Sequence, residues 1–175
     1  MGTRTPRDRR LLSDLWLMSA ATFRRLGKIE QARGAIQEAE VMDELNPAVW
    51  VQLGLYFTAL GNDARAVDSF HKALFIAADD ISATVHLCRL YLSAAVRAVG
   101  PLEGAVRGDV DLAAGMLEEA TRGAGWDVPE AWYFLAKAYG LQDRRSRERE
   151  CLLYALELSE GRGVREIAAA VGWCL

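Results

Sequence analysis

The residues of this chain that could do chemistry are few. There are two histidines, His71 and His86, and three cysteines. Neither histidine has the spacing from a cysteine or from the other histidine that a metal site or an activated nucleophile needs. The cysteines are Cys88, Cys151 and Cys174. Their odd number and wide spacing indicate reduced thiols and neither a disulfide framework nor a zinc site.

Two acidic pairs, Asp79-Asp80 and Asp109/Asp111, are the remaining candidates for acid–base or metal chemistry. We expect both to border helix starts, where carboxylates accept hydrogen bonds from free backbone amides. No glycine-rich phosphate loop and no nucleophile elbow occurs in the sequence. The sequence therefore predicts a protein that is not an enzyme and that has no catalytic residue, metal or cofactor.

Two groups of arginines could bind an acidic partner or an anionic lipid surface. The first group precedes the first predicted helix and comprises Arg4, Arg7, Arg9 and Arg10. The second group is interleaved with Glu148 and Glu150 and comprises Arg144, Arg145, Arg147 and Arg149. Solubility and ion pairs within a helix are the simpler interpretation, particularly for the second group.

Composition limits the class of protein further. The 175 residues carry a net charge of -3, with 51% apolar residues and four prolines, which favours a folded protein without a general attraction to nucleic acid. No apolar run reaches the roughly 18–20 residues of a membrane span. The N-terminus lacks the apolar core of a signal peptide. We therefore expect a cytoplasmic protein.

A register of 34 residues organises the elements that carry these side chains. Trp16 returns as Trp50, and Leu26-Gly27 returns as Leu60-Gly61. Two alanines also return at this offset: Ala32 as Ala66 and Ala39 as Ala73. This period, with tryptophan, glycine and alanine at these offsets, resembles the tetratricopeptide repeat (TPR), a helix–turn–helix unit that stacks into a solenoid.

The resemblance implies an all-α, right-handed solenoid of about four repeats. A basic segment and the start of the first helix occupy residues 1–12. The repeats cover residues 13–46, 47–80, 81–128 and 129–160, and residues 161–175 form a C-terminal capping helix. Gly27 and Gly61 are predicted to end the first helix of their repeats, and Pro47 to begin a helix.

Apolar residues at i, i+3, i+4 and i+7 predict the inward face of each helix. In the first helices these are Trp16, Ser19, Ala20 and Phe23, then Trp50, Leu53, Gly54 and Phe57. In the second helices they are Ala32, Ile36 and Ala39, then Ala66, Phe70 and Ala73. We expect Trp50 to be buried between the helices of its repeat.

The third and fourth repeats depart from the pattern. An insertion at about residues 95–107 is predicted to lengthen a helix and form an exposed loop at Gly100-Pro101, a candidate partner site, with Gly108 as the turn before a helix at 109–121. The fourth repeat has Trp132, Leu152 and Ala155 in register. Glu148 stands where a small alanine is expected, so its helix is predicted to start late or to splay outward.

Members of the TPR superfamily bind partners in a concave groove lined by the first helices. The corresponding residues combine an apolar strip with two cations, and they are Leu17, Val51, Leu55, Val85, Arg89, Tyr133 and Lys137. Family members that clamp a chaperone C-terminus use lysine, asparagine and arginine in this groove. This chain has other residues there, namely Leu17, Ala21, Gln52, Ser82 and His86. The strip suits a helix or an apolar peptide.

The stretch from Asp14 to Glu40, DLWLMSAATFRRLGKIEQARGAIQEAE, resembles the C-terminal repeats of one scaffold family. That family is the TPR subunit of the plasma-membrane phosphatidylinositol 4-kinase complex, with fungal members called cargo-transport proteins and animal relatives called tetratricopeptide repeat protein 7. The resemblance implies a non-catalytic bridge between the lipid kinase and a palmitoylated membrane-anchor protein, recruited peripherally to the plasma membrane. A TPR co-chaperone or adaptor for another peptide and an accessory domain of an enzyme remain the alternatives.

A second apolar stripe runs along the first helix. Leu11, Leu15, Met18 and Thr22 are spaced at i, i+4, i+7 and i+11. In a longer solenoid such a stripe would pack on a preceding repeat. Ten mostly polar residues precede Leu11, so we expect an exposed apolar patch that drives self-association or binds an upstream helical segment.

Overall fold

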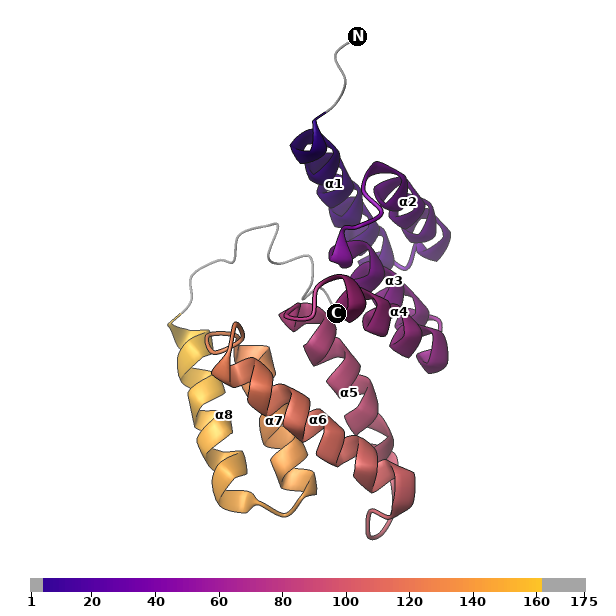
Figure 1. Cartoon of the computed structure of the whole chain (residues 1–175). Helices are drawn as coiled ribbons and strands as arrows, with labels where there is room; N and C mark the ends of the chain where they lie inside the picture. Colours follow the sequence, from indigo (N-terminus) through magenta and orange to yellow (C-terminus); the bar gives the residue numbers. More distant parts are fainter. Residues whose placement is uncertain (1–4, 162–175) are drawn as a thin grey trace. The chain divides into compact units, whose positions relative to one another are not determined.

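A computed structural model describes residues 5–161 of the chain, and all regular structure in this range is α-helical. The helices are α1 (Pro6–Arg25), α2 (Ile29–Met42), α3 (Pro47–Ala59), α4 (Asp63–Ile76), α5 (Ile81–Arg97), α6 (Gly104–Arg122), α7 (Pro129–Leu141) and α8 (Arg145–Glu160). They are labelled in Figure 1. The predicted C-terminal helix lies outside the described residues.

The described residues fall into two compact units, 5–83 and 84–161, with the boundary inside α5. In the first unit, α1 pairs with α2 and α3 pairs with α4, while α3 also packs on both α1 and α2. In the second unit, α7 pairs with α8 and packs on α6. Each pair is joined by a short turn, as Figure 1 shows for α7 and α8.

The turns within the pairs use a left-handed residue. Gly27 and Gly61 have φ values of +73° and +72°, a conformation that costs a residue with a Cβ atom more than it costs glycine. Both turns lie where the register predicts them. Asp143 takes the same place in the α7–α8 turn with a φ of +59°. Aspartate tolerates this region better than most residues do.

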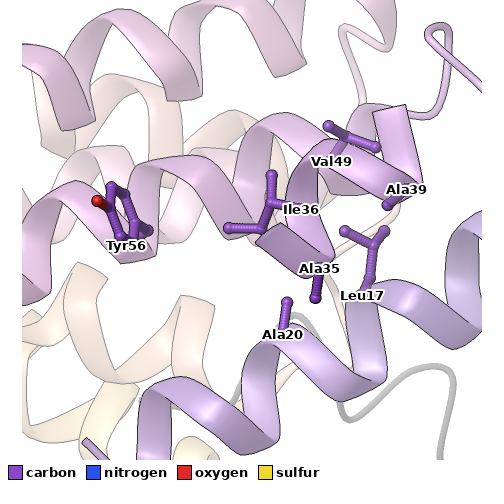
Figure 2. Packing of buried hydrophobic residues seen from close by; sticks show 7 residues of the cluster. All are labelled: Leu17, Ala20, Ala35, Ile36, Ala39, Val49 and Tyr56. Atoms are coloured by element: carbon purple, nitrogen blue, oxygen red, sulfur yellow. The ribbon is translucent and has the colours of Figure 1, made fainter. Parts of the chain in front are cut away.

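A core cluster joins the first three helices. Its buried members are Leu17 and Ala20 from α1, Ala35, Ile36 and Ala39 from α2, and Val49 and Tyr56 from α3. Figure 2 shows how these side chains converge from the three helices. The small–large–small sets predicted in α2 and α4 are fully or almost fully buried. Burial of this kind is the main source of stability in a helical hairpin.

Two predictions about the first helices are wrong. Trp16 is 38% exposed, and the buried residue beside it is Leu17. Trp50 is only partly buried at the margin of the core cluster, and the Lys72 ammonium lies 3.3 Å from the centre of its ring. The 34-residue register is preserved, but Trp16 is exposed and Trp50 packs against the core cluster without being fully buried.

The insertion in the third repeat is accommodated by longer helices. α5 continues to Arg97, the connecting loop is residues 98–103, and α6 begins at Gly104. Gly108 therefore lies inside α6 and is not the turn, which corrects the prediction. The left-handed positions are Gly100 and Gly104, with φ values of +102° and +56°. Asp109 and Asp111 also lie inside α6 and do not border a helix start.

The prediction that α8 starts late is wrong, because α8 begins at the position that the repeat register gives it. Its first residue, Arg145, corresponds to Asp63, the first residue of α4, when Pro129 is aligned with Pro47. Glu148 fits because the facing residue is Gly140, where an added Cβ would lie 2.5 Å from the Glu148 Oε1 atom. The carboxylate also pairs with the Arg145 Nη1 atom at 3.0 Å. Because Gly140 has no side chain, there is room for Glu148 between the two helices. The prediction that α8 splays outward is therefore wrong.

Candidate protein-interaction surfaces

A groove between α7 and α8 is an apolar hollow of the second unit. Its volume is about 450 Å³, and it is lined by Pro129, Glu130, Tyr133, Leu152, Ala155, Leu156 and Ser159. Tyr133 and Leu152 are each 41% exposed, and Leu156 is 55% exposed. Exposed apolar side chains around one concave surface are typical of a binding site for another protein.

Contacts within the second unit hold the groove in shape. The Trp132 ring packs edge-on against the Tyr154 ring, with 4.7 Å between the ring centres, and its Nε1 donates a hydrogen bond to the Trp126 carbonyl at 2.8 Å. The Tyr139 hydroxyl donates to the Glu118 carboxylate at 2.7 Å. Burial, followed by this carboxylate, raises the pKa of Tyr139. These contacts fix the spacing of α7 and α8 on one side and tie α7 to α6 on the other.

The predicted edge stripe on α1 is a second apolar surface. Leu11 and Leu15 are 59% and 49% exposed, Met18 is half-buried, and Thr22 is exposed. Trp16 adds to the exposed apolar area. Whether this stripe binds a partner remains a prediction.

The predicted groove strip is mostly inaccessible. Four of its seven residues are buried, namely Leu17, Val51, Leu55 and Val85. Side chains buried to this extent cannot contact a partner in this structure, so the continuous exposed strip is not present. Tyr133 and Lys137 are exposed on one face of α7, and Arg89 on α5 is partly buried. The Lys137 ammonium lies 5.2 Å from the centre of the Tyr133 ring.

The positions of a carboxylate clamp are also buried. Leu17, Ala21, Gln52 and His86 are each at most 3% exposed, while Ser82 is partly buried. The expectation that His86 lies on the surface or in a groove is therefore wrong. His71 is exposed on α4.

The arginines before the first helix bind the chain itself. α1 begins at Pro6, so Arg9 and Arg10 lie on the helix. The Arg9 Nε donates to the Met42 carbonyl at 3.2 Å, and the Arg10 guanidinium pairs with the Asp43 carboxylate. These contacts hold the turn between α2 and α3. They explain two of the arginines without an external partner.

One of the arginines at the start of α8 forms local ion pairs, as the simpler interpretation of this group predicts. Arg145 bridges Asp143 and Glu148, and these carboxylates raise the pKa of its guanidinium. The guanidinium carbons of Arg144 and Arg147 lie 5.5 and 5.7 Å from the centre of the Tyr139 ring. Cation–π geometry of this kind supports local packing.

A hollow of about 490 Å³ with a mixed polar and apolar lining borders the exposed 98–103 loop. It is lined by Pro101 and Leu102 from the loop and by residues of α6 and the α7–α8 turn, including Arg107 and Arg144. The Gln142 Nε2 donates to the Asp111 carboxylate at 2.7 Å beside it. The hollow offers polar contacts, but the predicted partner site at this loop stays a prediction.

The thiols in the described range are buried. Cys88 lies in the core with its Sγ 3.8 Å from the Ala113 carbonyl, and burial raises its pKa to about 12. Burial also raises the pKa of Cys151. Both thiols therefore stay protonated and unreactive near neutral pH. Cys174 lies outside the described residues.

The acidic pair at residues 79 and 80 caps a helix, as predicted. The Asp80 carboxylate accepts a hydrogen bond from the Ala83 amide at 2.7 Å in the first turn of α5. Within residues 5–161, no group of three or more histidine, cysteine or acidic side chains is placed to hold a metal ion. No helix of this range has the length and apolar character needed to cross a membrane.

The sequence did not identify the α7–α8 groove as a site. Leu152 was placed on the inward face, at the position of Ile36 and Phe70. The register places Leu156 at a position where the first repeat has Glu40. A leucine replacing a glutamate beside a core position is the signal from which an apolar groove could have been predicted.

The architecture is a TPR-type helical-repeat fold. TTC0263, a thermophilic TPR protein of Thermus thermophilus, superposes with a TM-score of 0.71 over 85% of this chain and 75% of that one, at 17% identity. MamA of Desulfovibrio magneticus RS-1 superposes with a TM-score of 0.61 over 86% of this chain and 77% of that one, at 21% identity. The predicted fold class, an all-α solenoid of TPR-type repeats, is confirmed.

A curated relative gives a more particular similarity. The chain is 26% identical over 151 residues to ypp1 of Schizosaccharomyces pombe, whose name describes a cargo-transport protein. The match covers 86% of this chain and 17% of the relative. No protein-family model matches the chain. The predicted resemblance to the fungal cargo-transport proteins is thus matched by a relative of that name.

Proposed function

We propose that this chain is a non-catalytic interaction scaffold that links a phosphatidylinositol 4-kinase to its palmitoylated membrane anchor. The observation that carries the proposal is the similarity to the cargo-transport protein ypp1 over 86% of the chain. The TPR-type fold supports it, since helical repeats present extended surfaces to other proteins. In this proposal the chain is cytoplasmic and reaches the plasma membrane through its partners.

The accessible remainder of the predicted groove is the proposed contact surface. Tyr133 and Lys137 lie one turn apart on α7 and are both exposed. A tyrosine beside a cation offers apolar area, a hydroxyl and a positive charge to an extended or helical partner segment. An acidic, partly apolar segment of the kinase or the anchor is the expected ligand.

A reconstitution experiment tests the proposal. The chain is immobilised and incubated with the recombinant lipid kinase, with the anchor protein and with both together. We expect one of the two to bind directly and the other to bind through it or beside it. Lys137→Glu should weaken binding by roughly 10-fold or more if the surface on α7 is used. Phe75→Glu, at an exposed apolar residue of α4, is the matched control.

Binding of neither protein, by a chain that remains helical, would contradict the kinase-bridging role. A fluorescence titration with an acidic chaperone C-terminal peptide tests the co-chaperone alternative at the same time. We expect no saturable binding, because four of the five clamp positions are buried. Saturable binding of the peptide would favour that alternative instead.

A further inference from the structure

The first hairpin shows how the α7–α8 groove could be filled. Three residues that line this groove are Tyr133, Leu152 and Ala155. When the hairpins are aligned on their turns, their counterparts in α1 and α2 are Leu17, Ile36 and Ala39. The two grooves are therefore equivalent positions of the same repeat.

The groove of the first hairpin is occupied by a helix. α3 packs on both α1 and α2, and Leu17, Ile36 and Ala39 are at most 4% exposed in the core cluster that includes Val49 and Tyr56 of α3. Figure 2 shows Val49 beside Ala39 and Leu17 of this cluster, with Tyr56 further along. Such a groove is therefore filled by one face of the first helix of the following repeat.

α1 carries the same face as α3, but in α1 this face is exposed. Leu15 is the counterpart of Val49 in the 34-residue register, and Thr22 is the counterpart of Tyr56. Val49 is fully buried, whereas Leu15 is 49% exposed. The chain thus has an exposed face on α1 that is equivalent to the face of α3 that fills the first groove. It also has an exposed groove, between α7 and α8, that is equivalent to the groove that α3 fills.

We propose that the exposed face of α1 in one copy of this chain packs into the α7–α8 groove of a second copy. Leu15 and Met18 would lie against Tyr133, Leu152 and Leu156. The contact would reproduce between molecules the packing that α3 makes on the first hairpin within one molecule.

The residues at the proposed contact are matched in polarity. At the internal contact, Asn46 donates a hydrogen bond to the Ser13 hydroxyl at 3.0 Å. The counterpart of Asn46 in α1 is Leu12, and the counterpart of Ser13 in α7 is Pro129. The Asn46–Ser13 pair inside the molecule is thus replaced by an apolar Leu12–Pro129 pair at the proposed contact. Asn46 also donates to Asp14, and the counterpart of Asp14 is Glu130 at the margin of the groove.

Charge at the helix ends is complementary. Only residues 43–46 separate α2 from α3, so the start of α3 lies near the end of α2. The counterpart of Pro47 in α1 is Ser13, so in the proposed contact the part of α1 that precedes Ser13 would pass the end of α8. Arg7 is exposed in the first turn of α1, and Glu157 and Glu160 are exposed in the last turn of α8. Opposite charges at these ends would favour one orientation of the docked helix.

The contact is heterologous, because it joins different surfaces of the two copies. Such contacts build rings or open filaments and are not limited to dimers. Sedimentation velocity of the full chain at roughly 1–200 µM should show an average mass that rises with concentration. Leu15→Glu and Leu156→Glu should each reduce self-association by about 10-fold or more. Phe75→Glu on α4 should leave self-association unchanged.

Mixing the two variants gives the sharpest test. Leu15→Glu keeps an intact groove, and Leu156→Glu keeps an intact α1 face, so an equimolar mixture should form one-to-one pairs that do not grow further. Leu152→Glu replaces Leu156→Glu if the latter loses helicity. Raising the salt concentration should weaken association, since Arg7 and the two glutamates are exposed.

Several results would overturn the proposal. One is a full chain that stays monomeric at all concentrations. A second is association that Leu156→Glu and Leu152→Glu leave intact while Leu15→Glu abolishes it, because that pattern indicates contact between two α1 faces. A third is a chain ending at Gly161 that associates when the full chain does not, because residues 162–175 would then cover the groove. Loss of kinase or anchor binding by Lys137→Glu concerns only the proposed function.

Discussion

The α3–α4 hairpin and the α7–α8 hairpin have the same helical arrangement, but different side-chain contacts hold them together. α3 and α7 are both 13 residues long, begin with proline and carry tryptophan at the fourth position. Three contacts differ between them: the cap of the first helix, the residue at the inter-helix turn and the partner of the tryptophan. The residues at the close approach of the two helices differ as well. In the earlier hairpin Gly54 faces Phe70, and the corresponding residues of the later hairpin are Ala136 and Leu152.

This comparison shows that the backbone of the repeat depends on matched pairs of residues more than on any single residue. The aromatic ring of Phe70 requires the glycine, because a Cβ on Gly54 would lie 2.4 Å from it. The smaller Leu152 allows alanine at the corresponding position of α7. The later hairpin leaves its groove open, which is the property on which the proposed self-association depends.

The largest expected effect concerns the cap of α3. Asn46 is buried, accepts a hydrogen bond from the Ala48 amide and donates to Ser13 and Asp14. Asn46→Ala should lower the free energy of unfolding by about 2–3 kcal/mol, since a cap, a buried hydrogen bond to Ser13 and a part-buried one to Asp14 are lost. Val128, its counterpart before α7, makes no side-chain cap, so Val128→Ala should cost clearly less. Equal losses in urea denaturation would contradict the comparison.

The next effect concerns the close approach of α3 and α4. Gly54→Ala should destabilise the chain by about 2 kcal/mol, because overpacking exceeds the gain in helix propensity. Adding Phe70→Leu should recover part of the loss, since it recreates the Ala136 and Leu152 pair. Gly34→Ala in α2, where an added Cβ meets nothing within 4 Å, should instead stabilise by about 0.5–1 kcal/mol. Thermal unfolding of the three variants distinguishes these outcomes.

Substitutions at the left-handed residues of the two turns should change the free energy of unfolding differently. Gly61→Ala places a Cβ at a φ of +72° and should cost about 1 kcal/mol. Asp143→Gly should be neutral or stabilising by about 0.5 kcal/mol, because the αL strain is relieved and the exposed ion pair with Arg145 contributes little. Denaturant midpoints compared at equal m-values measure both changes. A destabilised Asp143→Gly would show that the Asp143 side chain has a structural role beyond the turn.

The smallest effect concerns the partner of the tryptophan. Lys72 lies over the Trp50 ring, whereas Tyr154 packs edge-on against Trp132. Lys72→Met and Tyr154→Leu should each lower stability by about 0.5–1 kcal/mol, the range of an exposed cation–π or aromatic pair. High salt should reduce the difference between wild type and Lys72→Met and leave the Tyr154→Leu difference unchanged.

The sequence by itself determined the repeat and the residues that depend only on local geometry. The 34-residue register, the turns at Gly27 and Gly61 and the buried sets of α2 and α4 follow from helix periodicity and from the conformational freedom of glycine. These features are local, because each involves residues within one hairpin whose spacing can be read along the chain.

The tertiary structure decided which face of each first helix is buried. Leu17 was predicted to line an open groove and Trp16 to be inward, yet α3 packs on the hairpin and buries Leu17 while Trp16 stays exposed. The start of α6 at Gly104 and the fit of Glu148 against Gly140 likewise depend on packing. A helix with apolar residues on two faces can turn either face inward, and only the helices packed against it determine which.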